Sequence, residues 1–174
     1  MRLDGVVPEQ AANDPLSELF GGVTYDFRDM LDALEKARDD EQIEGLLLDM
    51  RGGTLGMAQI EELRAAIYRF REAEDKWSMA FFETAGEFAG ATGSYYLASA
   101  CEEIVLAPPG DVWFTGLRLE SPFLRGMFDK LDVEPHFGQR KEFKNAANTY
   151  THREFTAAHQ EALDALLDSL YDEM

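Results

Sequence analysis

The sequence predicts an α/β fold with a mainly parallel sheet and crossover helices. Three apolar runs bounded by charged or turn residues predict strands, at residues 43–50 (IEGLLLDM), 77–83 (WSMAFFE) and 103–108 (EIVLAP). Segments with apolar residues at helical spacing lie between the first two runs and before the first. Strands that alternate with helices are typical of parallel sheets, because parallel neighbours need a crossover connection.

The first half of the chain opens with a short expected strand, residues 2–7, which Pro8 ends, and a polar connection over residues 9–23. Asp26 then predicts a helix N-cap. The apolar stripe of this helix would be Phe27, Met30, Leu31 and Leu34. The run 43–50 that follows is apolar without alternation, so we expect a buried strand rather than a half-exposed one.

The middle of the chain continues the alternation. Glycines at residues 52–56 predict an abrupt turn into a second helix, whose shared apolar face would hold Ile60, Leu63, Ile67 and Phe70. After the strand at 77–83, a glycine turn should open a short helix near Tyr95. Residues 112–116 predict a further strand after the turn PPGD.

The last third predicts two helices. Ser121 as N-cap with Pro122 at the first helical position is a strong start signal for one of them. Residues 135–138 predict a brief strand, and Thr156 should cap the last helix. The apolar residues that repeat along that helix are Leu163, Leu166, Leu167 and Leu170.

The composition excludes some classes of protein. With a formal net charge of -18 and a pI near 4.4, the surface should repel phosphate backbones and anionic lipids, so we expect no nucleic-acid partner. Cys101, the single cysteine, cannot form an intrachain disulfide and should pack as a small buried apolar residue. No run of 18 apolar residues and no secretory signal are present, so we expect the chain as given to be soluble.

Two glycine-containing turns are candidate sites. At the turn after residues 43–50, Gly52 and Gly53 could let backbone N–H groups approach an anionic atom, but the pattern matches no nucleotide-binding motif and a purely structural turn is the favoured alternative. At the second turn, Thr92 and Ser94 carry hydroxyls where α/β enzymes can present a nucleophile. The alternative is that both residues only cap the helix, and no histidine base lies near them in the sequence.

The histidines do not predict a metal site. His136, His152 and His159 lack the spacing of zinc motifs, so we expect no metal and no cofactor. We expect His152 and His159 at the surface.

Lys144 is the third candidate. It lies beside Phe143, Asn145, Ala146 and Ala147, which could partly desolvate it, and burial favours the neutral amine that can act as a general base. The alternative is an ordinary surface or salt-bridged lysine.

Three segments, taken in order, resemble the signal peptide peptidase A (protease IV) family of bacterial serine proteases. They are residues 45–72 (GLLLDMRGGTLGMAQIEELRAAIYRFRE), 93–117 (GSYYLASACEEIVLAPPGDVWFTGL) and 124–156 (LRGMFDKLDVEPHFGQRKEFKNAANTYTHREFT). The resemblance runs from about Leu3 to the end of the chain and is specific to the amino-terminal half of long, two-repeat members. It implies the crotonase-like (ClpP-like) fold, with residues 1–174 forming one such domain within a longer protein.

The resemblance also implies a chemistry. In this family a serine attacks the peptide carbonyl and a lysine takes the proton, and the family's lysine corresponds to Lys144 in EFKNA. Arg140 and Lys141 would further favour a neutral amine. The position that aligns with the nucleophile of short members is Thr92; in long members the serine comes from the carboxy-terminal repeat. Gly52 or Gly53 falls where the family has its oxyanion-hole glycine, but the working hole of long members should belong to that other repeat.

We therefore expect the lysine-bearing domain of a membrane-anchored signal peptide peptidase, inactive alone, with its catalytic part on the extracytoplasmic side of the inner membrane. The expected partners are signal peptides, the carboxy-terminal repeat and further copies of the chain. Two rival functions are a non-catalytic crotonase-like assembly module and an acyl-CoA enzyme, the second disfavoured by the few basic residues available for phosphates. A third possibility is local catalysis by Thr92 or Ser94.

Overall fold

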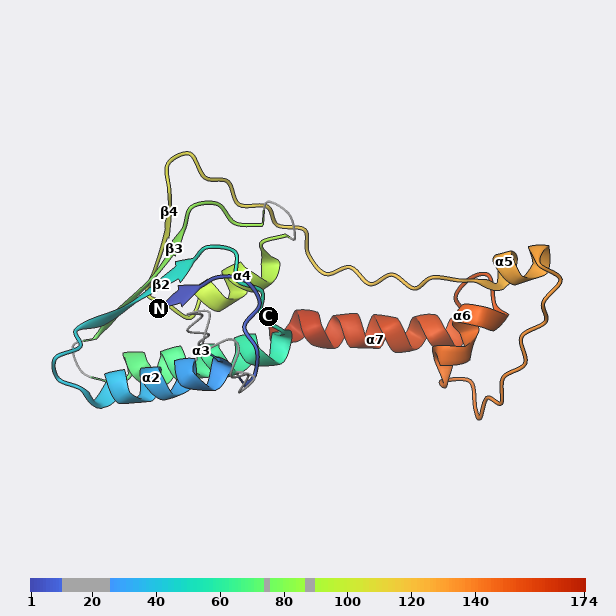
Figure 1. Cartoon of the computed structure of the whole chain (residues 1–174), viewed down its shortest axis with the longest axis horizontal. Helices are drawn as coiled ribbons and strands as arrows, with labels where there is room; N and C mark the ends of the chain where they lie inside the picture. Colours follow the sequence, from blue (N-terminus) through green and yellow to red (C-terminus); the bar gives the residue numbers. More distant parts are fainter. Residues whose placement is uncertain (11–25, 74–75, 87–89) are drawn as a thin grey trace, which may run out of the picture. The chain divides into compact units, whose positions relative to one another are not determined.

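The structure is a computed structural model that describes residues 1–10, 26–73, 76–86 and 90–174 (Figure 1). The chain divides into two compact units, Met1–Gly116 and Leu117–Met174, which are described separately below. Unit 1 contains β1 (Arg2–Leu3), α2 (Phe27–Asp39), β2 (Gly45–Met50), α3 (Met57–Arg71), β3 (Trp77–Phe82), α4 (Thr92–Ala98) and β4 (Glu103–Leu106). Unit 2 contains α5 (Arg125–Lys130), the 3-10 helix η1 (Asn145–Ala147), α6 (Asn148–Thr151) and α7 (Ala157–Glu173).

Unit 1 is built on a four-stranded sheet with the order β1-β2-β3-β4. Every neighbouring pair is parallel, as the register of Leu47 with Met79 and of Met79 with Glu103 illustrates. The sequence prediction of an α/β fold with a parallel sheet is confirmed, and the arrangement is consistent with a crotonase-like fold. The expected connection at residues 9–23 lies largely outside the described residues.

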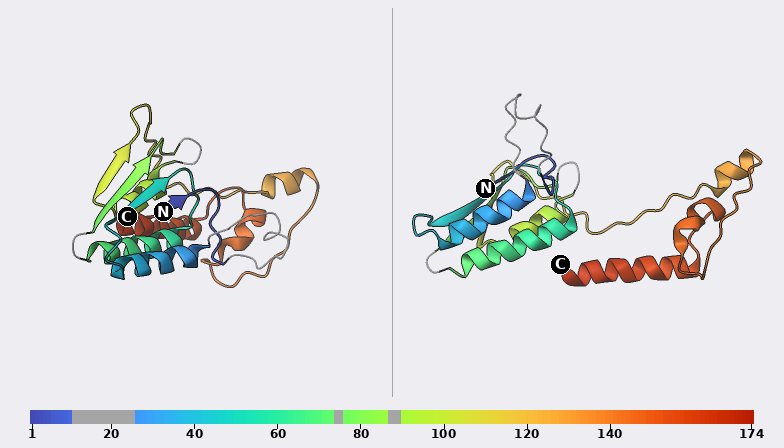
Figure 2. Two further views of the ribbon diagram at one scale, coloured as in Figure 1. Left: turned by 60° about the vertical axis from the view of Figure 1, so that its left-hand side comes forward. Right: turned by 60° about the horizontal axis from the view of Figure 1, so that its bottom comes forward.

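Helices α2 and α3 run side by side along one face of this sheet (Figures 1 and 2). Their predicted stripes supply the core: Phe27, Met30 and Leu34 from α2, and Ile60, Leu63, Ile67 and Phe70 from α3, are all buried. Asp26 is the N-cap of α2, and its side chain accepts a hydrogen bond from the N–H of Asp29. Cys101 is buried in the same core, as expected.

The opposite face of the sheet is exposed in unit 1. Leu46, Leu48 and Met50 face the helices, whereas Leu47 between them is 47% exposed. The Trp77 side chain is equally exposed and lies over Gly45, where a Cβ would overlap its ring. The prediction that residues 43–50 form a fully buried strand is therefore wrong, because helices cover only one face of the sheet.

Several elements differ from the sequence predictions. The first strand ends at Leu3, since Gly5 has a φ of +64°, and Val6 makes only an isolated bridge with Thr54. Residues 112–116 form no strand, and Val112 makes one bridge with Ala85. Helix α5 begins after Leu124 rather than Ser121, and residues 135–138 form no strand. In these segments local propensity lacked a neighbouring strand or packing surface to stabilise it.

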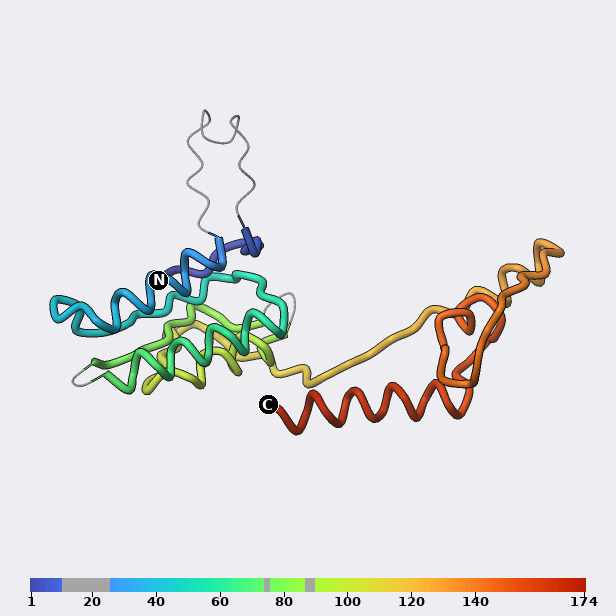
Figure 3. Tube along the Cα trace, turned by 90° about the horizontal axis from the view of Figure 1, so that it is seen from below, coloured from blue at the N-terminus to red at the C-terminus, as the bar shows by residue number. Residues whose placement is uncertain are grey.

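Unit 2, whose chain can be followed in Figure 3, buries little of its apolar surface. Throughout residues 117–174, all of which the structure describes, only Asn148 and His159 are buried. Thr156 is the N-cap of α7, as predicted, and accepts a hydrogen bond from the N–H of His159. The leucine stripe of α7 is not buried within the unit, and Leu166 is exposed. Among the described residues, no helix combines the length and apolarity that crossing a bilayer requires.

Candidate functional site

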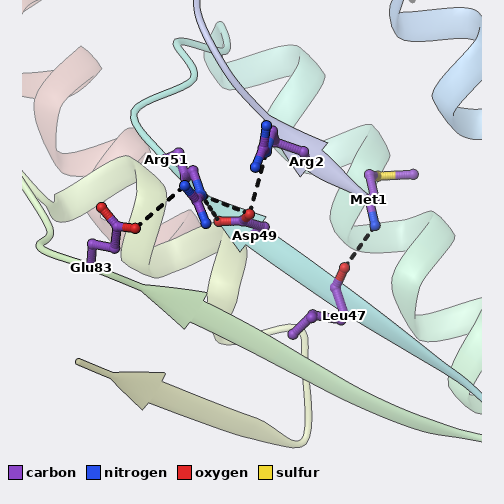
Figure 4. Close-up of polar contacts among 6 residues, drawn as sticks. All are labelled: Met1, Arg2, Leu47, Asp49, Arg51 and Glu83. Carbon is purple, nitrogen blue, oxygen red and sulfur yellow. Dashed lines mark hydrogen bonds and ion pairs between the residues drawn. The ribbon is translucent and has the colours of Figure 1, made fainter.

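The first predicted turn lies at the carboxyl end of β2, where a charged network holds the preceding arginine. Arg51 pairs with Asp49 at 2.9 Å and with Glu83 at 3.4 Å, so it joins the ends of β2 and β3 (Figure 4). Asp49 also accepts a hydrogen bond from Arg2 of β1 (Figure 4). These charges fix the start of the turn that leads into α3.

Both glycines of this turn are structurally required. Gly52 has a φ of +97°, a left-handed conformation that side chains strongly disfavour. At Gly53 a Cβ would lie 2.8 Å from the backbone carbon of Leu3 in β1. The structural interpretation of these glycines is therefore supported, and close backbone approach remains available to a ligand.

The second turn opens α4, which begins at Thr92 and not near Tyr95. Ala91 occupies the N-cap position and makes no side-chain capping bond. Ser94 Oγ donates to the carbonyl oxygen of Ala91 at 3.0 Å, a bond that follows the local turn. The Thr92 hydroxyl is buried and, among the described residues, has no hydrogen-bond partner. Helix capping therefore does not account for Thr92.

A cavity of about 590 Å³ lies at the carboxyl ends of β2 and β3, where ligands commonly bind in parallel α/β sheets. It brings together Gly52, Gly53 and Ser94, which the sequence predicted separately. Thr92 does not line it. The rest of its wall is mainly apolar, with Met50, Leu55, Ile60, Phe82 and Leu97 among the lining residues.

Lys144 belongs to unit 2, in the turn that leads into η1. It is the N-cap residue of η1, and its N–H donates to the carbonyl oxygen of Lys141 at 3.4 Å. Lys141 itself has a φ of +66°, which turns the chain sharply just before Lys144. A cavity of about 470 Å³ is lined by Lys144 together with Phe137, Gly138, Gln139, Arg140, Phe143, Asn145, Ala146 and Ala147.

The neighbours of Lys144 do not desolvate it within this chain. Residues 136–144 are all exposed, and the Phe143 side chain is 52% exposed. The expectation that Phe143 and the following residues partly bury the amine is therefore wrong for the chain by itself. The physical reason is that no apolar core lies beneath this turn.

The histidine predictions are corrected at one position. His136 and His152 are exposed, but His159 is only 6% exposed and packs against Phe123 and Phe155, with ring centroids 6.2 Å and 5.0 Å away. Among the described residues, no group of three His, Cys, Asp or Glu side chains could hold a metal ion.

Sequence reasoning also missed Asn148, which is 1% exposed and lies eight residues before Thr156, the N-cap of α7. The available signal was the pair of asparagines three residues apart, Asn145 and Asn148, directly after Lys144. Such a spacing places both amides on the same side of a helical turn.

Comparison with known proteins decides the family. A model of Peptidase family S49 matches residues 84–174, which is more than half of the chain and includes α4 and Lys144. The chain belongs to Peptidase family S49. Family membership agrees with the resemblance that the sequence motifs carried.

Curated relatives of this S49 chain are proteases. It is 28% identical over 136 residues to "Serine protease SPPA, chloroplastic" of Arabidopsis thaliana, an alignment that covers 78% of the chain and 19% of the relative. It is 29% identical over 147 residues to "Protease 4" of Haemophilus influenzae, an alignment that covers 83% of the chain and 23% of that relative. It is 30% identical over 134 residues to "Protease 4" of Salmonella typhi, which covers 77% of the chain and 21% of that relative. The chain thus spans about a fifth of the length of these relatives.

Proposed function

We propose that the protein containing this chain is a serine endopeptidase that degrades cleaved signal peptides, with Lys144 as the general base of a Ser/Lys dyad. The S49 match across residues 84–174, which contains Lys144, is the observation that carries the proposal. The serine is supplied by a carboxy-terminal repeat outside this chain. The chain alone is accordingly inactive as a peptidase.

The chemistry assigned to Lys144 is proton transfer. Its neutral amine accepts the proton of the serine hydroxyl as the serine oxygen attacks the peptide carbonyl carbon. The resulting ammonium then protonates the leaving amine, and the acyl-enzyme remains. In the second half of the cycle a water molecule loses its proton to the lysine and attacks the ester. The lysine ammonium then returns this proton to the departing serine oxygen, which releases the acid and restores the serine and the neutral amine.

Such a base needs a surrounding that disfavours its charged form, and the turn by itself does not provide one. Lys144 lies beside Phe137 and Phe143 at the wall of an open cavity, and both rings are exposed. Docking of the serine-bearing repeat against these rings would remove water from the amine. Arg140 lines the same cavity as Lys144.

The exposed apolar side chains of unit 2 support assembly with other protein surfaces. They include Met127, Leu131, Val133, Phe137, Phe143 and Tyr171. Large exposed apolar groups are typical of interaction surfaces. We assign them to contacts with the carboxy-terminal repeat and with further copies of the protein, in a homo-oligomer attached to the inner membrane by an anchor outside this chain. The catalytic part faces the extracytoplasmic side.

The decisive experiment is peptide hydrolysis by the full-length protein carrying Lys144→Ala. Loss of the general base should lower kcat by about 10²- to 10⁴-fold. Lys130→Ala is the matched control, because Lys130 is an exposed lysine of the same unit and ends α5. Undiminished turnover by the Lys144 variant would remove the assigned role.

The second candidate is a non-catalytic assembly module, and the exposure of Lys144 in this chain favours it. It predicts that the full-length protein forms oligomers but hydrolyses no peptide, with or without Lys144. Measuring the oligomeric state and the peptidase activity on one preparation separates the two functions.

A further inference from the structure

Asn148 is the most buried residue of unit 2, although its side chain is a polar amide. It is 1% exposed and is the first residue of α6, directly after η1 and four residues beyond Lys144. Burial of an amide is unfavourable unless its hydrogen bonds are replaced. The contacts of Asn148 therefore indicate what this burial achieves.

The Asn148 amide links the turn that carries Lys144 to the first turn of α7. Its Nδ2 lies 3.5 Å from Asn145 Oδ1 and 3.4 Å from Thr156 Oγ1, and can donate to both. Thr156 Oγ1 also accepts from the N–H of His159 at 3.2 Å. The same hydroxyl thus holds the beginning of α7 and the beginning of α6.

The other residues of α6 attach this short helix to different parts of unit 2. The carbonyl oxygen of Thr149 accepts from the N–H of Leu124 at 2.7 Å, at the start of α5. The Tyr150 ring stacks on Phe137, with centroids 5.1 Å apart. Thr151 Oγ1 donates back to the carbonyl oxygen of Ala147 in η1 at 3.0 Å. Asn148 supplies the connection to α7.

The Asn148 side chain is not arranged for stability alone. Its Oδ1 is buried and, within the described part of the chain, has no hydrogen-bond partner. A buried acceptor without a partner lowers stability, so an apolar residue would serve a purely structural role better. Retention of an amide at a cost to stability is typical of functional positions.

We infer that Asn148 is a positioning residue for Lys144. Its amide fixes η1 against the cap of α7 and thereby holds the backbone of Lys144, the N-cap residue of η1, in place. This inference rests on the proposed function of Lys144. A lysine side chain has four rotatable bonds, so its amine can be held in place only if its Cα is fixed. A displacement of about 1 Å at a catalytic group can cost about 10²-fold in rate.

The first test uses the full-length protein with Asn148→Ala, and Thr151→Val as matched control. The control removes a hydrogen bond from the same helix without touching the link to α7. We expect kcat to fall about 10- to 100-fold in the Asn148 variant with KM unchanged, and to change less than about threefold in the control. Equal effects of both variants on kcat would overturn the inference.

Asn148→Leu keeps roughly the volume of the side chain and serves where the alanine variant fails to fold. Leucine cannot donate to Asn145 Oδ1 or Thr156 Oγ1, so kcat should fall about 10- to 100-fold with KM unchanged. A merely structural role predicts instead that kcat stays within about threefold of the unmodified protein, because an apolar side chain fills the buried site. Unchanged kcat in a folded Leu variant would therefore count against positioning.

Hydrogen exchange separates failure of this inference from failure of the proposed function. The backbone amides of residue 148 and of His159, whose N–H groups donate to the carbonyl oxygen of Asn145 and to Thr156 Oγ1, should exchange faster in Asn148→Ala than in Thr151→Val, whether or not the protein is a peptidase. Unchanged exchange refutes the positioning role even if Lys144→Ala abolishes activity. Faster exchange together with an active Lys144→Ala variant refutes the proposed function and leaves Asn148 holding a non-catalytic turn.

Discussion

Unit 1 and unit 2 contrast in what they bury. In unit 1 a parallel sheet and helices α2 and α3 enclose apolar side chains such as Leu48, Leu63 and Ile67, all of which are fully buried. In unit 2 the buried residues are Asn148 and His159, and the aromatic rings are largely at the surface. A chain segment that leaves its apolar side chains exposed gains little hydrophobic stabilisation by itself. The contrast teaches that the apolar core of unit 1 stabilises its own fold, whereas unit 2 taken by itself gains little from apolar burial.

The largest expected difference between the two units is the loss of stability when one phenylalanine is removed from each. Phe70→Ala leaves a hole in the core of unit 1, where Phe70 is 1% exposed, and should lower the free energy of unfolding by about 3–5 kcal/mol. Phe143→Ala in unit 2 should change it by less than about 0.5 kcal/mol. Urea unfolding of the 174-residue chain, followed by circular dichroism, measures both. Similar losses would show that unit 2 has a core of its own.

Adding one methyl group to each unit sharpens the comparison. At Gly110 in unit 1 a Cβ would overlap the carbonyl oxygen of Glu83, so Gly110→Ala should cost about 1–3 kcal/mol. At Gly126 in α5 a Cβ meets nothing within 4 Å, so Gly126→Ala should stabilise the helix by about 0.5–1 kcal/mol. The same unfolding measurement applies. A destabilising Gly126→Ala would reveal packing around α5 that the structure lacks.

Exclusion of water from the core of unit 1 should also be visible in the pH dependence of stability, through the buried Cys101 thiol. Burial raises the pKa of the Cys101 thiol from 9.0 to about 11, and a nearby Arg71 charge opposes the shift only partly. The stability that this shift contributes is complete below pH 9 and is lost as the pH rises toward 11, because the unfolded thiol ionises first. Between pH 7.5 and pH 10 the free energy of unfolding of the unmodified chain should fall by roughly 1 kcal/mol more than that of the Cys101→Ala variant. Identical pH dependence of the two unfolding free energies would contradict a dry site.

The smallest expected effect concerns the charged surface of unit 2. Hydrogen bonds from Arg153, then the nearby charge of Arg125, hold the pKa of the Asp129 carboxyl below its usual 3.8. Any stability from this shift is present above pH 3.8 and is lost as the pH falls through the lowered pKa. Arg153→Ala should raise that pKa toward its ordinary value, as a carboxyl carbon NMR titration would show. Arg118→Ala, which removes a cation paired instead with Glu120, should leave it unchanged.

Local sequence signals determined much of this protein. The Asp26 and Thr156 caps, the apolar stripes of α2 and α3 and the three main strands were predicted, because each depends on residues a few positions apart. The spaced motifs around residues 45–156 also indicated the family. The role of Lys144 stays a prediction.

Tertiary structure alone decided which surfaces are covered. Within one apolar run, Leu48 is buried and Leu47 is exposed. Unit 2 contains many aromatic and leucine residues, yet they form no apolar core within it. The tertiary structure also brought Gly52, Gly53 and Ser94 to one cavity. It buried Asn148, which sequence reasoning had not noted, and His159, which sequence reasoning had placed at the surface. Burial depends on which distant segments pack together, and a periodic pattern specifies only the face that is available for packing.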